Sequence, residues 1–402
     1  MNHFFIIIFT KRNDYDLKRW IHLIYDWIII GGGIQGSILA NFLLKEKKTT
    51  VERLAIIDPH EEPLANWKHC TGLIDMPYLR SPSVHHIDSL PFSLQEFNKI
   101  KGETKNFYGR YKRPSLDLFN EHCRHVIEDT RLNKCWHQGK VIHAERTGNL
   151  WTIQTEIGQA FTSYNLVLSV GIGNQLAIPD WAQENPNAQH IFDPALHSLE
   201  EVKSPVAVIG GGITAVHTAV KLSSLYPGNV TLIKRHPFRI HDFDSDPAWL
   251  GPKKQHPFRR LSSYRKRREL IKEARHKGSI PQELFLKVKR LTEKGHLSIV
   301  DGEVDYYDKD TLHLKEGLTI EAKRVILATG FVQTLPEKQW LTPLIHEHKL
   351  NCSDCGYPIV SHSLQWGPNL YVTGALAELE VGPIARNISG ARQAAQLIVN
   401  SL

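Results

Sequence analysis

The chain has 402 residues and a net charge of +7, and 41% of its residues are hydrophobic and 23% charged. These values exclude a disordered, collagen-like or coiled-coil protein and predict two or three globular domains. Five cysteines, an odd number, predict no disulfide framework and favour a cytoplasmic protein.

The first recognisable element is preceded by an extension. We interpret residues 1–24 as an N-terminal extension, either a disordered tail or the product of an upstream start, because a nucleotide-binding strand normally begins within the first few residues. Its longest apolar run, Phe4 to Phe9, is far shorter than the roughly 20 residues of a membrane-spanning helix. We therefore expect no membrane partner.

A strand, a glycine turn and a helix then follow in direct succession. The strand ends at Ile30, and the turn Gly31-Gly32-Gly33-Ile34-Gln35-Gly36 leads into a helical stretch. In a G-x-G-x-x-G turn the first glycine permits the bend, the second admits a pyrophosphate and the third lets the helix pack on the strand. The anion lies at the helix N-terminus, where free N–H groups favour negative charge. We assign Gly31, Gly33, Gln35 and Gly36 to a cofactor site.

The next strand supplies an acid. Residues Leu54 to Ile57 end in Asp58, which lies 22 residues after Gly36. A carboxylate at this distance usually receives a ribose hydroxyl, so the first site predicts a ribose-bearing cofactor such as FAD.

The same pattern occurs a second time. The strand Val206 to Ile209 leads into Gly210-Gly211-Gly212-Ile213-Thr214-Ala215, and we assign Gly210, Gly212 and Thr214 to a second cofactor site. At the end of the following strand, Lys234 and Arg235 replace the acid. Cations at this position fit a 2′-phosphate, so the second site predicts NADPH.

The two halves correspond beyond the glycines. Each half later contains a buried strand that ends in glycine, Leu166 to Gly171 and Val325 to Gly330, at an offset of about 160 to 180 residues from loop to loop and strand to strand. We predict an α/β fold with two Rossmann-like dinucleotide-binding domains. Residues 25–195 and 331–402 form the FAD-binding domain, and residues 196–330 form the NADP-binding domain inserted in it, with the irregular stretch 179–205 as the first crossing.

A basic segment lies within the predicted NADP-binding domain. Residues Lys253 to Lys294 contain 15 Lys or Arg against 4 Glu, which gives this segment +11 and leaves −4 for the rest of the chain. We interpret it as a solvated helical face that attracts NADPH, because long-range attraction of phosphates requires no aromatic residues that read bases. Nucleic acid is the weaker alternative, and we expect no nucleic-acid partner.

Two nested glycine turns with Ala328-Thr329-Gly330 after the second resemble flavin- and NADPH-dependent monooxygenases, particularly the lysine and ornithine N-hydroxylases of siderophore synthesis. The resemblance covers about residues 25 to 400. Trp67 and the stretch Met76 to Pro82, with Arg80, resemble the family's segment that runs past the flavin, so the resemblance implies that Trp67 and Arg80 contact FAD. It also implies FAD, NADPH, O₂ and oxygen transfer through a C4a-hydroperoxyflavin.

The substrate side departs from that family. Asp242 to Pro247 stands where the family has an Asp-Ser-Pro-Phe stretch, but the Asn-Glu that follows there is replaced by Ala248-Trp249. The resemblance therefore supports the cofactors better than amino-acid hydroxylation. Asp244 and Asp246 are our polar candidates for the substrate, with a helix cap or Asx turn as the alternative role.

The C-terminal segment completes the predicted site. Gly374 and Asn387 lie among small residues that let the backbone approach a bound ring or phosphate, with tight helix packing as the alternative. Cys352 and Cys355 form a single C-x-x-C, which favours ordinary thiols over zinc or redox chemistry, and we expect no metal site.

We therefore predict an FAD-dependent monooxygenase that uses NADPH and O₂ to hydroxylate a small molecule, with amine N-hydroxylation as the leading reaction. The alternatives are a flavin oxidoreductase that passes electrons to another acceptor, and a flavin-bound redox sensor. A homo-oligomer is left open.

Overall fold

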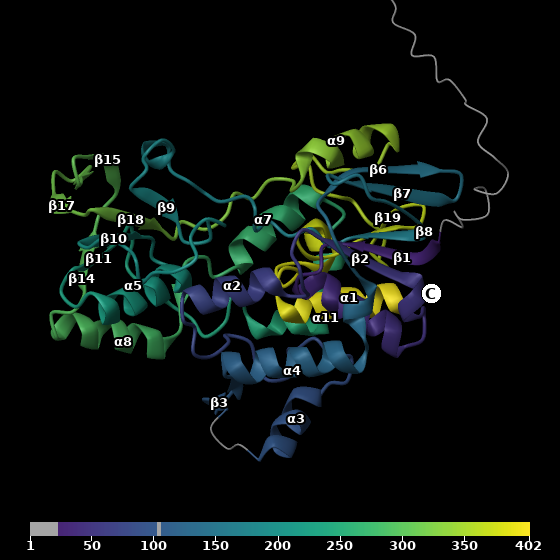
Figure 1. Cartoon of the computed structure of the whole chain (residues 1–402), viewed down its shortest axis with the longest axis horizontal. Helices are drawn as coiled ribbons and strands as arrows, with labels where there is room; N and C mark the ends of the chain where they lie inside the picture. The colour runs from purple at the N-terminus through teal and green to yellow at the C-terminus, as the bar shows by residue number, and fades with distance from the viewer. Residues whose placement is uncertain (1–22, 103–105) are drawn as a thin grey trace, which may run out of the picture.

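A computed structural model describes residues 23–102 and 106–402. The predicted α/β fold is confirmed, because two sheets with parallel cores carry helices on their faces. Figure 1 shows the two sheets at opposite ends of the long axis, with α2 (Ala65–Leu73) and α7 (Tyr264–Ala274) between them. Residues 1–22, which contain most of the predicted N-terminal extension, lie outside the described residues. No helix of the described part is long and apolar enough to cross a membrane.

The first sheet is centred on β1 (Ile24–Ile30), which ends at the residue that the sequence predicts. Its last four residues are buried, as expected for a parallel strand covered on both faces. β1 pairs in parallel with β2 (Leu54–Asp58) and β8 (Ala160–Leu168), in the order β19-β20-β8-β1-β2-β5. The remaining strands are β5 (Trp136–Gln138), β6 (Val141–Thr147), β7 (Leu150–Thr155), β19 (Gln365–Gly367) and β20 (Leu370–Val372).

Helices cover both faces of the first sheet. α1 (Ile34–Lys45) packs against α11 (Ile388–Val399), so the C-terminal helix lies beside the helix that follows the first glycine turn. Figure 1 shows this pair on one side of the sheet and α9 (Lys338–Glu347) on the other. The other helices before the second sheet are α3 (Ser93–Lys101) and α4 (Leu116–Asp129).

The second sheet is entirely parallel, with the order β14-β11-β10-β18-β9. Its strands are β9 (Ala188–His190), β10 (Val206–Ile209), β11 (Val230–Lys234), β14 (Ser298–Asp301) and β18 (Arg324–Leu327). α5 (Ile213–Leu225) packs against α8 (Gln282–Glu293), and Figure 1 shows both on the same side of this sheet. A small antiparallel sheet follows, formed by β15 (Val304–Asp308), β16 (Thr311–Leu314) and β17 (Thr319–Glu321).

The division between the two sheets differs from the predicted boundaries in two places. β9 lies before residue 195 in the stretch predicted to be irregular, yet it pairs with β18, because the adjacent Ile191 is fully buried in the core of the second sheet. Conversely, Phe258 of α6 (Pro252–Arg260) and Ile271 of α7 belong to the core of the first sheet. The segment between β12 (Arg239–Ile240) and β13 (Ser279–Ile280) thus reaches back toward the first sheet.

Candidate cofactor and substrate site

The first glycine turn joins β1 to α1 in a shape that only glycine permits. Gly31 has a φ of +98°, and a Cβ there would lie 2.7 Å from the carbonyl oxygen of Ser169 at the end of β8. A Cβ on Gly36 would lie 1.9 Å from the carbonyl oxygen of Gly31. Gly33, the N-cap of α1, faces open space, and no side chain of the described residues caps the helix. Free N–H groups and room for a ligand at a helix N-terminus fit a pyrophosphate.

Asp58 fixes this turn. Its Oδ2 accepts a hydrogen bond from the backbone N–H of Gly32 at 2.7 Å. Its Oδ1 lies 2.9 Å from the backbone N and 2.7 Å from Nδ1 of His60, a residue that the sequence analysis did not single out. The carboxylate therefore stands beside the glycine turn, as predicted, and the ribose contact stays a prediction.

The structure brings Gln35 together with the predicted C-terminal residues. Gln35 Nε2 donates to the carbonyl oxygen of Ala385 at 3.0 Å, and a Cβ on Gly374 would lie 3.2 Å from Gln35 Cγ. Asn387 is the N-cap of α11, but its side chain makes no capping hydrogen bond to the described residues. Segments some 350 positions apart therefore meet at the first glycine turn.

Trp67 is held by a neighbouring helix. Its indole Nε1 donates to Asn120 Oδ1 at 3.1 Å, and its ring lies 5.4 Å from that of Phe119. The start of α2 touches the glycine turn, because the backbone N of Leu64 donates to the carbonyl oxygen of Gly32 at 3.3 Å. Trp67 thus lies three residues after the contact of Leu64 with the turn, and its indole N–H is bound by Asn120 of α4. Its contact with a flavin stays a prediction.

Arg80 and Asp244, predicted for different ligands, pair with each other. Arg80 Nη1 lies 2.6 Å from Asp244 Oδ1. The same guanidinium donates to the carbonyl oxygens of three consecutive residues and to one hydroxyl: His241, Asp242, Phe243 and Ser279 Oγ. Arg80 therefore joins β13 and the stretch around Asp244 to the part of the chain before the second sheet. This pair could not be predicted from the sequence, because its two residues are separated by 164 positions.

Asp246 takes the alternative role that we gave it. Its Oδ1 accepts from the backbone N of Ala248 at 2.8 Å and caps the short 3₁₀ helix Pro247–Leu250. Its Oδ2 lies 2.6 Å from Lys254 Nζ. The hydrogen bond from Lys254 and the cap together lower the pKa of Asp246. Both carboxylate oxygens are thus engaged within the chain.

The second glycine turn joins β10 to α5. Gly212 is the N-cap of α5, no side chain of the described residues caps this helix either, and Thr214 lies in its first turn. A Cβ on Gly212 would lie 3.3 Å from Cα of Gly278. Gly278, which the sequence analysis missed, lets the segment before β13 approach the turn closely. The turn is again open to an anion at a helix N-terminus.

The two predicted cations of this turn have different environments. Lys234 has a side chain only 6% exposed, pairs with Asp301 and lies over the Phe238 ring at 4.9 Å. Its ammonium is therefore committed to the second sheet, contrary to our expectation that it meets a 2′-phosphate. Arg235 is exposed, and its guanidinium has no hydrogen bond or ion pair with any described residue. Arg235 is the cation that remains for a ligand.

Part of the basic segment is buried, which corrects our interpretation of a solvated face. Arg267 and Arg268 of α7 are 7% and 9% exposed, and they pair with Glu380 at 2.9 Å and Glu378 at 2.7 Å. Both glutamates belong to the short helix α10 (Glu378–Val381), shortly after Gly374. Arg265 on the same helix remains solvated, with a side chain 82% exposed.

Cys352 and Cys355 are free thiols. Cys355 is exposed, and its Sγ lies 3.0 Å from the hydroxyl of Ser353. Burial acts to raise the pKa of Cys355, but hydrogen bonds from Ser353, the backbone and Arg268 outweigh burial and lower it.

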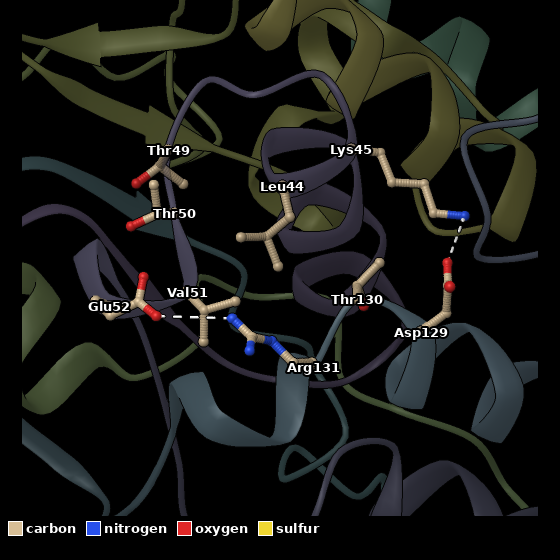
Figure 2. Close-up of a pocket in the computed structure, with 9 residues that line it drawn as sticks. All are labelled: Leu44, Lys45, Thr49, Thr50, Val51, Glu52, Asp129, Thr130 and Arg131. Carbon is tan, nitrogen blue, oxygen red and sulfur yellow. Dashed lines mark ion pairs between the residues drawn. The ribbon is translucent and has the colours of Figure 1, made fainter.

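A pocket of about 450 Å³ lies at the far end of α1 from the glycine turn. Figure 2 shows two ion pairs in it, Lys45 with Asp129 at 3.4 Å and Arg131 with Glu52 at 3.7 Å. None of the predicted site residues lines this pocket.

No protein-family model and no curated sequence matches the chain. The fold is similar to solved flavoenzyme structures. An ornithine hydroxylase from Pseudomonas aeruginosa has a TM-score of 0.74 and 17% identity over 94% of this chain and 98% of its own. An ornithine N-hydroxylase from Kutzneria sp. 744, solved with reduced FAD, NADP⁺ and L-ornithine, has a TM-score of 0.72 and 15% identity over 94% and 98%.

A third structure represents a different activity. A bacillithiol disulfide reductase from Staphylococcus aureus has a TM-score of 0.63 and 18% identity over 94% of this chain and 97% of its own. These likenesses confirm the fold that the sequence resemblance implied, that of the flavin-dependent N-hydroxylating monooxygenases.

Proposed function

We propose that the chain is an FAD-dependent monooxygenase that uses NADPH and O₂ to hydroxylate a small molecule, with amine N-hydroxylation as the leading reaction. One observation carries the proposal. In each of two strand-turn-helix units, no side chain of the described residues caps the helix N-terminus. The following strand ends in the acid Asp58 in the first unit, and it is followed by the exposed cation Arg235 in the second. An acid at this position receives a ribose hydroxyl, as FAD carries, whereas a cation accommodates the 2′-phosphate of NADPH.

In this proposal the first region, built on the first sheet, holds FAD. The backbone N–H groups around Gly33 and the N-terminus of α1 bind the pyrophosphate, and Gly374 and Asn387 line the opposite side of the cofactor. Asp58 orients the turn through Gly32 and receives a ribose hydroxyl on a remaining lone pair.

The second region, built on the second sheet, holds NADPH. The N-terminus of α5 binds its pyrophosphate, and Arg235 binds the 2′-phosphate through charge-assisted hydrogen bonds. When bound, the two cofactors supply the reducing equivalents and the activation of O₂. The chain positions them and excludes water.

The segment around Asp244 encloses the site from the second region. Arg80 fastens this segment to the first region through one carboxylate and three carbonyl oxygens. Excluding water from the site prevents activated oxygen from being released as H₂O₂ before it reaches the substrate. We therefore infer that the Arg80–Asp244 pair holds the two regions in the closed arrangement, and that direct substrate contact by Asp244 depends on that pair opening.

A rival function has one observation in its favour. The exposed thiol of Cys355 has a lowered pKa, and a disulfide reductase has a similar fold. Thiolates attack disulfides, so electron transfer to a disulfide acceptor is the second candidate. A cytoplasmic location and a homo-oligomer both stay predictions.

The deciding experiment measures NADPH oxidation, O₂ uptake and H₂O₂ release by the FAD-loaded protein, with and without a panel of primary amines. The proposal expects one amine to raise O₂ uptake, to lower the H₂O₂ released per NADPH and to yield a hydroxylamine. Arg80→Gln is expected to increase H₂O₂ release, whereas the exposed control Arg265→Gln leaves it unchanged. Turnover only with dyes or with low-molecular-weight disulfides, without oxygenated product, would instead establish the rival.

A further inference from the structure

Three arginines surround one buried glutamate beside the proposed flavin site. The side chain of Glu378 is 1% exposed. It lies 2.7 Å from Arg268 Nη1, 2.5 Å from Arg386 Nε and 3.7 Å from Arg275 Nη1. We call these four residues the arginine cluster. Three guanidiniums and one carboxylate leave an excess of two positive charges in a site largely withdrawn from solvent.

The carboxylates around the cluster do not neutralise this excess, and another acidic group beside it is the Cys355 thiol, which interacts with Arg268. Asp244 interacts with Arg275, but Arg80 already pairs with Asp244 at 2.6 Å. On the other side of α10, Glu380 is shared by Arg259 and Arg267. Each acid near the cluster is therefore matched by at least one additional arginine. Buried charges that lack a counterion are costly, so such an arrangement favours binding of an anion.

The cluster also has unused hydrogen-bonding capacity. Arg275 Nη1 is buried and has no hydrogen-bond partner among the described residues, whereas Arg268 also interacts with the thiol of Cys355. The guanidinium of Arg275 makes no hydrogen bond to any described residue, and it is the most accessible of the three, with a side chain 26% exposed. Guanidinium groups present planar pairs of donors that match carboxylate or phosphate oxygens. A small adjustment of Arg275 thus presents it to an incoming anion.

The position of the cluster links it to the proposed active site. Arg386 directly follows Ala385, whose carbonyl oxygen accepts the hydrogen bond from Gln35 in the first glycine turn. On the other side, the backbone of Arg275 forms an isolated bridge with Ser245, next to Asp244. The cluster therefore lies between the segment assigned to FAD and the segment that faces it from the second region.

We propose that the arginine cluster binds the anionic group, a carboxylate or a phosphate, of the small-molecule substrate, with Arg275 as the arm that closes on it. The assignment rests on the proposed function, because it places the anion next to the FAD site. It deepens that function by predicting a substrate with both a group to be oxygenated and an acidic group.

The test measures anion binding without catalysis. The FAD-loaded, oxidised protein is heated at constant ionic strength with increasing succinate, inorganic phosphate or neutral succinamide, and the dissociation constant is taken from the rise of Tm with concentration. The proposal expects succinate or phosphate to raise Tm and succinamide to have no effect. The stronger of the two anions identifies the acidic group. Equal effects of all three compounds, or no effect of either anion, would overturn the assignment.

Three variants locate the site. Arg275→Gln is expected to weaken the binding of the anion about tenfold or more, as the loss of a charge-assisted contact does, while Arg275→Lys weakens it less. Arg265→Gln, on the helix α7 that ends directly before Arg275, controls for the loss of one positive charge. Arg235→Gln controls for binding at the NADPH turn. Undiminished binding in Arg275→Gln, or a loss seen in Arg235→Gln instead, contradicts the proposal.

Two further readouts separate the alternatives. If Arg275 only supports the fold, Arg275→Gln lowers Tm equally with and without the anion; if it serves FAD, the variant loses its flavin. Either result overturns the assignment. The titration requires no oxygen chemistry. A protein that binds the anion but forms no oxygenated product would therefore contradict the proposed function and leave the anion site supported.

Discussion

The two glycine turns share one design but differ in how tightly they are built. In the first, the third glycine position is Gly36, whose Cβ would lie 1.9 Å from the carbonyl oxygen of Gly31. In the second, the corresponding residue is Ala215, so this position has room for a Cβ. A Cβ built on Gly210 would lie 3.1 Å from the Cβ of Ala215. The helix of the first turn therefore packs more closely on its strand.

The residues at the end of the next strand also differ in how tightly they hold the turn. Asp58 turns back and hydrogen-bonds Gly32, so it closes the first turn. Lys234 turns away to Asp301 and leaves Arg235 exposed. The first turn is thus internally fastened, as suits a cofactor that stays bound. The second keeps its cation free, as suits a cofactor that enters and leaves in each cycle.

The largest expected effect is that of Gly36→Ala. The added Cβ collides with backbone rather than with a flexible side chain, so we expect a loss of about 3 kcal/mol or more in the free energy of unfolding. The variant should also lose FAD. The reverse change in the second turn, Ala215→Gly, is expected to cost only about 1 kcal/mol through helix propensity. Urea unfolding and the flavin content of the purified protein measure both. Similar losses in the two variants would contradict the difference in packing.

Acid should weaken the first region more than the second. Burial lowers the pKa of His86 to about 4 and of His122 to about 3 in the first region, and that of His217 to about 4 in the second. An unfolded histidine takes up its proton near pH 6.5, so the unfolded state binds more protons than the native state between about pH 6.5 and pH 4. Stability therefore falls as the pH decreases through this window, and each pKa unit of depression contributes about 1.4 kcal/mol.

Urea unfolding at pH 7 and pH 5 tests this dependence. His122→Phe and His217→Phe should each flatten this loss of stability by a similar amount, because both native pKa values lie below pH 5. A stability that is equal at the two pH values in the unmodified protein would contradict the prediction.

Asp58→Asn tests the fastening of the first turn. The amide keeps the shape of the side chain but loses the charge that strengthens the bond from Gly32, so we expect about tenfold weaker FAD binding. Release of flavin on dilution, followed by fluorescence, measures the affinity. Glu62→Gln is the matched control, because Glu62 is exposed and, within the described part of the chain, forms an ion pair only with Lys68. Equal flavin affinity in Asp58→Asn and the control would show that Asp58 does not contribute to FAD binding.

The most selective expected effect is that of Arg235→Gln. We expect the KM for NADPH to rise about tenfold with little change for NADH, because only NADPH carries the phosphate. Arg265→Gln should change neither. An equal rise for both nucleotides would show that Arg235 does not read the 2′-phosphate.

The parts of the site that depend on short spacings were predictable from the sequence. The glycine turns, Asp58 and the cap at Asp246 each require residues within one strand-turn-helix unit, and local patterns fix such units. The parts that depend on distant partners were not predictable. No local pattern near Lys234 indicates its ion pair with Asp301. The pairing of Arg80 with Asp244 likewise joins two regions that are distant in the sequence.

The basic segment shows the same limit. Its composition indicates a solvated face, and Arg265 has that environment, but Arg267 and Arg268 meet two glutamates more than 100 positions away. The only signal in the sequence was a pair of acids, Glu378 and Glu380, within an apolar stretch after Gly374. The strand β9 was missed for a related reason, because three residues are too few for a periodic pattern.

In our proposal the tightly built turn holds FAD, and the open turn holds NADPH, which reduces it. The most direct test records the visible flavin absorbance of the purified protein and then adds NADPH or NADH under anaerobic conditions. The account predicts a yellow protein that bleaches faster with NADPH than with NADH, and a smaller difference between the two in Arg235→Gln. A colourless protein that takes up no FAD, or a flavin that NADPH does not reduce, would contradict it.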